Sequence, residues 1–247
     1  HYAYSPNNYL KLNSDIFSKM RGYFNQFGLG LKTGIDLPGE IAGLEGNTHD
    51  SSGNLLVGSA LDLSYGNYDN YTLIQMLQYI SAIANNGYRM KPFLVNSISQ
   101  TLSDGSSGPV LTSTQPSVTS KIDNTQDQIN LVKQGMWQVV HGTNGWTTAT
   151  SLNTLNPGVA GKTGTAQGFA RESKDSALTE TITESFVGYA PAKDPKIAIA
   201  VIIPNLKAET TTPYQLQIAK EMFTDFYQMN NIKEDKDYSI HQKTVNG

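Results

Sequence analysis

Apolar residues recur at helical spacing in four stretches of the chain, and each stretch carries polar residues on its other face. This pattern is typical of helices that pack one side against a core. Gly28, Gly87 and Gly142 lie just beyond the first three stretches, where a helix is expected to end. The expected helices cover residues 14–27, residues 72–86, residues 126–140 and a C-terminal stretch that begins at Thr212-Pro213.

Polar residues at two of the helix starts support these boundaries. Thr72 and Gln75 have the spacing of a capping box, in which each side chain accepts a hydrogen bond from the backbone N–H of the other residue. Asn13 or Ser14 can cap the first helix. Both starts therefore offer side-chain acceptors for backbone groups that the helix itself leaves unpaired.

Shorter apolar runs follow the third helix and are expected to be strands. They cover Val159–Gln167, Glu184–Ala190 and Ile197–Ile203. The turn signal Pro191-Ala-Lys-Asp-Pro195 between the last two predicts an antiparallel hairpin. Residues 97–125 are rich in Ser, Thr and Gly, which predicts a long loop or a poorly packed hairpin. Helices followed by a small antiparallel sheet and a closing helix indicate an α/β (α+β) fold, not a doubly wound one.

The composition of the chain and its N-terminal residues limit the classes of protein that we expect. The 247 residues are 38% apolar, contain no Cys and carry a net charge of −3, which does not favour nucleic acid as a partner. The longest strongly apolar run, Ile197–Ile203, is far too short to cross a bilayer. The chain starts without Met or an apolar leader, so we expect a fragment whose signal or membrane anchor lies upstream.

The residue pattern predicts neither a metal site nor a cofactor. The four His residues show no metal-ligand spacing, and the chain has no Cys and no phosphate-binding loop. His141 follows the third helix, where an imidazole is favourable beside the negative end of the helix dipole. We therefore interpret His141 as a residue of the helix end and not as a ligand.

The tripeptide Lys-Thr-Gly occurs twice, and the surroundings separate the two copies. Lys32-Thr-Gly34 lies in a Gly-rich stretch that leads into Asp36-Leu-Pro-Gly39, which is typical of turns. We expect Lys32 to be an ordinary solvated loop lysine. Lys162-Thr-Gly164 lies in an expected strand that precedes an apolar hairpin, so only this copy is a candidate for chemistry.

The groups of the second copy suit a reacting centre. Lys162 supplies a fixed positive charge, and the Thr163 hydroxyl can donate to a substrate carboxylate. Gly164 removes a side chain where another backbone must come close, so that an extended peptide can lie along the strand edge. The Thr165 N–H can then face a developing oxyanion. The alternative is an edge strand whose lysine only discourages aggregation, and the tripeptide alone favours that plainer interpretation.

Further stretches make the chain resemble the class B penicillin-binding proteins. Lys162-Thr-Gly-Thr-Ala-Gln167 looks like the third signature of the penicillin-recognising serine acyltransferases, which also carry Ser-x-x-Lys and Ser-x-Asn. The similarity covers most of residues 23–204 and is greatest to the penicillin-binding protein 2B group of Gram-positive bacteria. The other matching stretches are Phe27–Gly30, Thr33–Gly39, Tyr68–Thr72, Ala84–Gly87, His141–Thr143 and Phe186–Pro191.

The resemblance implies a function for the whole protein. The chain would be the C-terminal part of a transpeptidase domain, covering residues 1–247 with residues 230–247 as a flexible tail. A serine would attack peptidoglycan stem peptides that end in D-Ala-D-Ala, and β-lactam antibiotics would acylate the same serine. The protein would act without a cofactor at the extracellular face of the cytoplasmic membrane, alongside proteins of cell division or elongation.

The resemblance also implies roles for individual residues. Lys162 and Thr165 would be catalytic, with the Thr165 backbone N–H as one oxyanion donor. The substrate-binding residues would be Thr163, Gly164 and Gln167. The residues that would only shape or pack the fold are Asp36, Pro38, Phe186 and Tyr189.

The nucleophile of the family is missing from this chain. No Ser lies three positions before any Lys, so Ser-x-x-Lys is absent. Ser-x-Asn begins at Ser5, Ser52 and Ser151, and we interpret all three as chance matches, although Ser5 has the most plausible spacing before Lys162. We expect a chain that begins past the second motif, is inactive alone, and has a core that is incomplete or is completed by another chain.

Two other functions are compatible with the sequence. A serine β-lactamase or β-lactam sensor would share the third motif, but the stretches within residues 27–87 look like the class B proteins. A deacylation assay on the full-length protein would separate the two. A non-catalytic cell-wall binding module would explain the absent Ser-x-x-Lys, and the upstream sequence would decide between this module and an enzyme.

Overall fold

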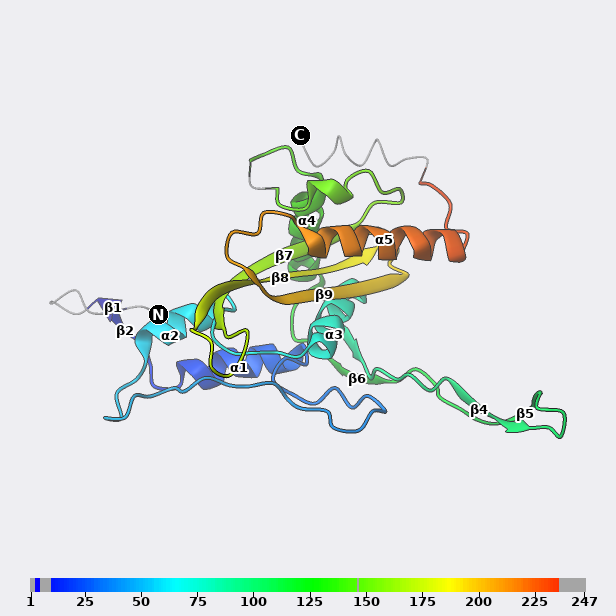
Figure 1. Cartoon of the computed structure of the whole chain (residues 1–247), viewed down its shortest axis with the longest axis horizontal. Coiled ribbons are helices and arrows are strands. Elements are labelled where there is room, and N and C mark those ends of the chain that lie inside the picture. The colour runs from blue at the N-terminus through cyan, green and yellow to red at the C-terminus, as the bar shows by residue number, and fades with distance from the viewer. Residues whose placement is uncertain (1–2, 5–9, 146, 236–247) are drawn as a thin grey trace. The chain divides into compact units, whose positions relative to one another are not determined.

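The computed structural model describes residues 3–4, 10–145 and 147–235 (Figure 1). The chain forms two compact units. Unit 1 runs to residue 79 and includes residues 88–123, whereas unit 2 consists of residues 80–87 and the chain from residue 124 onward. The helix α3 (Leu73–Ala84) therefore contributes its first part to unit 1 and its last residues to unit 2.

Unit 1 combines helices with pairs of short strands. Its described strands pair antiparallel as β1 with β2, β3 with β6, and β4 with β5. A small core joins Phe17 to Ala60 and Leu63, which come from the first two helices. Besides the start of α3, the elements are β1 (Ala3–Tyr4), β2 (Leu10–Lys11), α1 (Ile16–Gln26), α2 (Val57–Ser64), β3 (Tyr88–Met90), β4 (Ser97–Thr101), β5 (Ser107–Ser113) and β6 (Val118–Lys121).

A buried ion pair holds the irregular segments of unit 1 against α1. Arg21 donates from Nη2 to Oδ1 of Asp69 at 2.7 Å and from Nε to Oδ2 at 2.8 Å. The Asp69 side chain is only 1% exposed and also accepts from the N–H of Gly46. Burial opposes the charge on Asp69, but the hydrogen bonds from Arg21 and Gly46 outweigh it and lower the pKa of Asp69. The pair thus fixes a loop through two charges that neutralise each other.

The helix ends show which capping predictions were correct. Thr72 N donates to Oε1 of Gln75 at 2.8 Å and Gln75 N donates to Oγ1 of Thr72 at 3.4 Å, so the predicted capping box is confirmed. The prediction of Asn13 or Ser14 as the cap of α1 was wrong. Asp15 occupies that position and makes no capping hydrogen bond, and its carboxylate pairs with Lys19 one turn further on.

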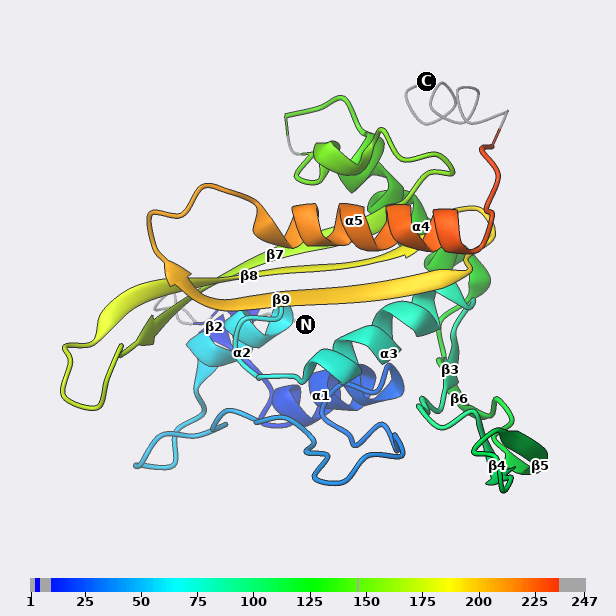
Figure 2. The same cartoon turned by 45° about the vertical axis from the view of Figure 1, so that its right-hand side comes forward.

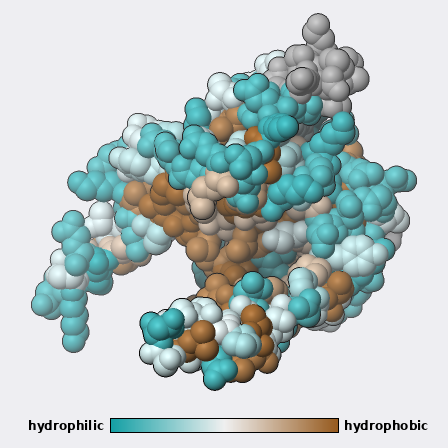
Figure 3. Space-filling view, turned by 90° about the vertical axis from the view of Figure 1, so that its right-hand side faces the viewer, coloured by the Kyte–Doolittle hydropathy of each residue, from teal (hydrophilic) through white to brown (hydrophobic). Residues whose placement is uncertain are grey.

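Residues 97–113 form the poorly packed hairpin that was one of the two expected outcomes. Strands β4 and β5 pair with two irregularities in their register. Ile98, Val110 and Leu111 are each more than half exposed, and Figure 3, in which this hairpin faces the viewer, shows hydrophobic side chains on its surface. The low apolar content of the segment leaves it without a core of its own.

Unit 2 is a three-stranded antiparallel sheet covered by helices. The strand order is β7-β8-β9, and α5 lies along β8 and β9 (Figure 2). The core brings together Val140 of α4, Phe186 of β8 and Phe223 of α5, all fully buried. The elements are α4 (Gln126–His141), a 3-10 turn η1 (Thr150–Leu152), β7 (Ala160–Ala170), β8 (Thr179–Ala190), β9 (Ile197–Lys207) and α5 (Tyr214–Met229).

The observed elements confirm the expected mixed fold with an antiparallel sheet and packed helices. All four expected helices and all three expected strands are present, and the hairpin between β8 and β9 turns at the predicted Pro-rich segment. Helix α2 and the pairing of β3 with β6 were not predicted. Both are short and are held by contacts distant in the sequence. None of the helices in the described residues is long and apolar enough to cross a bilayer.

Two glycines make room for the central aromatic ring of unit 2. A Cβ atom on Gly161 would lie 2.4 Å from Cζ of Phe186, and one on Gly188 would lie 2.7 Å from Cε1 of the same ring. Both distances are shorter than any tolerable contact between carbon atoms. Phe186 is fully buried because β7 and β8 each present bare backbone to its ring. Tyr189 is buried as well, as expected of a packing residue.

His141 is buried and uncharged, which corrects the interpretation of this residue as a partner of the helix dipole. Its ring stacks on Trp137 with 3.7 Å between the ring centroids, and Nε2 lies 3.0 Å from the carbonyl oxygen of Val159. Burial lowers the pKa of His141 to about 4, although the hydrogen bond to Val159 opposes the shift. The helix ends at His141, but the imidazole serves there as a neutral donor and a packing surface.

Replacing Gly161 by Ala should destabilise the protein by about 1–3 kcal/mol, because the new methyl group collides with the buried Phe186 ring. Gly168 on the same strand is the matched control, since its added Cβ would meet only Oγ1 of Thr181 at 3.5 Å, an ordinary contact. Chemical denaturation of the two variants measures the difference. Equal stabilities for Gly161→Ala and Gly168→Ala would contradict the packing argument.

Acidification should destabilise the protein through His141. Its pKa is about 4 in the folded state against 6.5 ordinarily, so only the unfolded chain takes up a proton between these values. The stabilising contribution is complete above pH 6.5 and is lost as the pH falls towards 4. Urea midpoints measured across this range should fall less steeply for His141→Gln than for the unmodified protein. The same replacement at exposed His49 is the control, and identical slopes for all three proteins would contradict the assignment.

Candidate active-site strand

Strand β7 carries the candidate residues along an edge of the sheet. It pairs with β8 in unbroken antiparallel register from Ala160–Tyr189 to Ala170–Thr179, and no strand of the described residues pairs with its other side. The core residues of unit 2 fix this register because Phe186, opposite Thr163, fits only against the neighbouring glycines. The sequence Lys-Thr-Gly-Thr is therefore held rigidly. On the side of β7 that faces away from β8, its backbone N–H and C=O groups pair with no strand of the described residues.

Lys162 and Thr163 lie on opposite faces of the sheet. Lys162 stands opposite Val187 and is exposed, whereas Thr163 stands opposite the core residue Phe186 and is half-buried. The Lys162 ammonium folds back along its own strand and donates from Nζ to the carbonyl oxygen of Thr163 at 2.6 Å. The lysine thus places a positive charge against the backbone of the strand.

The hydroxyl of Thr163 has a partner that the sequence did not reveal. Oγ1 of Thr163 lies 2.7 Å from Oγ1 of Thr148, and either hydroxyl can donate. Thr148 lies in the segment that connects α4 to η1, and its neighbour Ala149 is fully buried. No motif links residues 148 and 163. The contact exists because the core holds their two segments side by side.

Gly164 lies next to a side chain of the neighbouring strand. A Cβ atom at this position would lie 2.6 Å from Oγ of Ser185 on β8, so the glycine accommodates a neighbouring side chain. Ser185 also lies within reach of the Gly164 carbonyl oxygen, at 3.4 Å.

The remaining candidates of the strand, Thr165 and Gln167, are exposed. Thr165 stands opposite Glu184 in β8. Glu184 is only 8% exposed, and its Oε2 finds no hydrogen-bond donor among the described residues. A buried carboxylate oxygen without a donor next to the candidate strand is a polar feature that the sequence pattern did not indicate.

The other Lys-Thr-Gly copy belongs to a structural loop, as expected. Lys32 is exposed in an irregular segment, and Thr33 is buried with its N–H donating to Oε1 of Glu40. The loop continues to Asp36, whose carboxylate accepts from the N–H groups of Leu94 and Val95 at 2.7 and 2.9 Å. These bonds explain why Asp36 shapes the fold.

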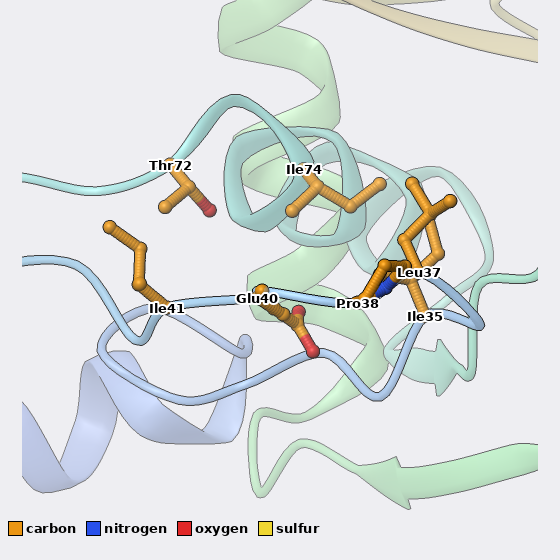
Figure 4. A pocket seen from close by; sticks show the side chains of 8 residues that line it. Ile35, Leu37, Pro38, Glu40, Ile41, Thr72 and Ile74 are labelled. Atoms are coloured by element: carbon orange, nitrogen blue, oxygen red, sulfur yellow. The ribbon is translucent and has the colours of Figure 1, made fainter.

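An apolar pocket of about 250 Å³ lies beside this loop in unit 1 (Figure 4). Its lining includes Ile35, Leu37, Ile41 and Ile74, with Glu40 as the one charged residue. The Glu40 carboxylate is committed to Thr33 and to the N–H of Gly34. The one charged group of the pocket is therefore engaged in holding the loop.

Two of the three Ser-x-Asn matches, those at Ser52 and Ser151, lie in residues that the structure describes. Ser52 belongs to an exposed turn in which Asp50 accepts from the N–H groups of Ser52 and Asn54. Ser151 lies exposed in η1. Ser5 lies outside the described residues, as does the tail from residue 236. Within residues 10–145 and 147–235, no group of three His, Cys, Asp or Glu side chains could hold a metal ion.

Comparison with known proteins identifies the family. Residues 4–228 match the family described as Penicillin binding protein transpeptidase domain. Penicillin-binding protein 2A of Bacillus subtilis (strain 168) is 38% identical over 95% of this chain and 32% of its own length. Penicillin-binding protein H of the same strain is 40% identical over 83% of this chain and 28% of its own length.

A solved structure supports the same relationship. Penicillin-binding protein 2B of Streptococcus pneumoniae (strain R6) superposes with a TM-score of 0.78 at 31% identity, covering 94% of this chain and 36% of that protein. The chain spans about a third of the length of the relatives that it matches. The sequence match and the shared fold together establish that this chain belongs to the penicillin-binding protein transpeptidase family.

Proposed function

We propose that this chain is the C-terminal part, residues 1–247, of the transpeptidase domain of a class B penicillin-binding protein, and that β7 lines its acyl-transfer site. The observation that carries the proposal is the sequence Lys162-Thr-Gly-Thr165 on the free edge of a rigid antiparallel sheet. A D,D-transpeptidase needs such an edge, because its donor substrate is an extended peptide that can pair with a strand.

Backbone geometry supports a role for Thr165 as an oxyanion donor. The carbonyl oxygen of Thr163 is reached by the Lys162 side chain, so it faces away from β8. In an antiparallel strand the backbone groups of alternate residues point to the same side. The N–H of Thr165 therefore points to the free edge, where a carbonyl oxygen of the substrate can receive it.

The side chains of the strand supply charge and hydrogen bonds to the substrate. In the proposed site the Lys162 ammonium and the Thr163 hydroxyl attract the terminal carboxylate of the stem peptide, while Gly164 and Gln167 border the bound chain. The local positive charge of Lys162 also stabilises negative charge that develops near the reacting serine. Lys162 and Thr163 lie on opposite faces of the sheet. Both can contact the same ligand only if that ligand lies along the free edge of β7, where the two faces meet.

The proposed reaction is an acyl transfer in two steps. A serine outside this chain attacks the carbonyl carbon between the two D-Ala residues, giving its proton to a general base, and the terminal D-Ala leaves as the protonated amine. The amine of a neighbouring stem peptide then attacks the ester, and the serine regains its proton. β-Lactams acylate the same serine by ring opening.

The proposal includes the setting of the whole protein. We place the domain at the extracellular face of the cytoplasmic membrane, held by an anchor outside this chain, with cell-division or elongation proteins as partners. The isolated chain is expected to be inactive because it contains no Ser-x-x-Lys.

Acylation of the full-length natural protein by a labelled penicillin tests this function. Lys162→Ala should lower the second-order rate of acylation about 100-fold, because the charge beside the ligand carboxylate and the reacting centre is lost. Lys32→Ala, in the other Lys-Thr-Gly copy, is the matched control and should react like the unmodified protein. Intact mass spectrometry measures the adduct.

Two outcomes would contradict the proposal. One is a full-length protein that is not acylated, or that loses acylation in Lys32→Ala and not in Lys162→Ala. The other is a stoichiometric adduct on the isolated chain, which would assign the nucleophile to a serine within it, with Ser5 the first to examine. Rapid release of the acyl group would favour a β-lactamase, whereas a persistent adduct favours the transpeptidase.

A further inference from the structure

We infer that Thr148 is a positioning residue that directs the Thr163 hydroxyl towards a ligand carboxylate, so that it sets the preference of the site for ligands carrying that group. The inference rests on the proposed function of β7. Its basis is the hydrogen bond between the two Oγ1 atoms, 2.7 Å apart, from segments on either side of η1.

The number of protons that the two hydroxyls carry sets the direction of their hydrogen bonds when a carboxylate is bound. Each threonine hydroxyl has one proton to donate and two lone pairs that accept. A carboxylate only accepts. When Thr163 donates its proton to a carboxylate, the bond to Thr148 persists only if Thr148 donates to Thr163. The ligand therefore selects one orientation of the pair, Thr148 to Thr163 to carboxylate, and bonds in such a chain strengthen one another.

The position of Thr148 is fixed independently of β7. The N–H of Ala149 donates to the carbonyl oxygen of Val139 in α4 at 3.1 Å, and the Ala149 side chain is fully buried. On the other side, Thr147 donates from Oγ1 to the carbonyl oxygen of Asn144 at 2.9 Å. The bond from Ala149 to α4 thus anchors the backbone next to Thr148, and the turn from Asn144 to Thr147 shapes the chain on its other side, so that the Thr148 hydroxyl is held beside the neighbouring strand.

The effect of Thr148 reaches the ligand only through Thr163. Thr163 is β-branched, so its hydroxyl occupies one of a few staggered positions. The bond to Thr148 selects one of these positions and, once a carboxylate is bound, leaves the Thr163 proton free for the ligand. Without the Thr148 hydroxyl, the Thr163 hydroxyl takes up the required orientation only when the ligand binds.

Acylation of the full-length natural protein by a penicillin and by its neutral methyl ester tests the inference. Thr148→Val keeps the shape but removes the hydroxyl, and it should slow acylation by the free acid about 3- to 10-fold, the worth of one net hydrogen bond. Acylation by the ester should change less than twofold. Thr148→Ser should restore the rate with the acid. Thr150→Val, an exposed threonine of η1, is the matched control.

A double-mutant cycle locates the effect at Thr163. In the background of Thr163→Val, the further change Thr148→Val should have no effect on the acid, because its only route to the ligand is gone. Equal slowing of acid and ester by Thr148→Val, or no slowing of either, would overturn the inference while leaving the proposed function intact. An unmodified protein that the acid does not acylate would instead refute the proposed function, and the inference with it.

Thermal unfolding of each variant checks that the substitution leaves the protein folded. If Thr148→Val does not fold, Thr148→Ala and Thr148→Ser provide the same comparison with smaller side chains. A ratio of acid to ester rates that is the same for Ala and Ser at position 148 would overturn the inference, because the hydroxyl would then make no difference.

Discussion

The packing of one phenylalanine against two glycines is the constraint on which unit 2 depends. Phe186 is fully buried between the bare backbones at Gly161 and Gly188. A shift of β7 by one residue would bring a side chain under this ring and would also turn every residue of the strand to the other face. The register of β7 therefore follows from core packing. The positions of the candidate residues on β7 depend on the same packing.

The same core also organises the segment between α4 and β7. Ala149 and Leu152 are buried in it together with Phe186, which holds Thr148 beside Thr163 although neither threonine is itself buried. A hydrophobic cluster thus determines the distance between two polar groups at its surface. Thr163 lies on a rigid strand, and the buried Ala149 anchors the segment that carries Thr148.

The sequence predicted regular features well, because their causes are local. Four helices followed from apolar periodicity, and the capping box of Thr72 and Gln75 followed from spacing alone. The Thr148–Thr163 contact could not be predicted, because it depends on how the intervening chain folds. His141 shows a different failure: the helix dipole was identified, but burial under Trp137 decides the charge of the imidazole. Spacing identifies candidate residues, whereas burial decides their chemistry.

Helix α3 has a consequence for folding while the chain is being synthesised. Its first part belongs to unit 1, but residues 80–87 belong with α4 and the sheet of unit 2. Ile80 and Ile83 are buried in the finished protein, and Lys133 of α4 donates to the carbonyl oxygen of Ala84 at 2.9 Å. On the ribosome, all of residues 88–123 must be synthesised before α4 exists. The end of α3 therefore remains without this hydrogen bond, and without the rest of unit 2, during that part of translation, when an incomplete chain is exposed to aggregation and to chaperones.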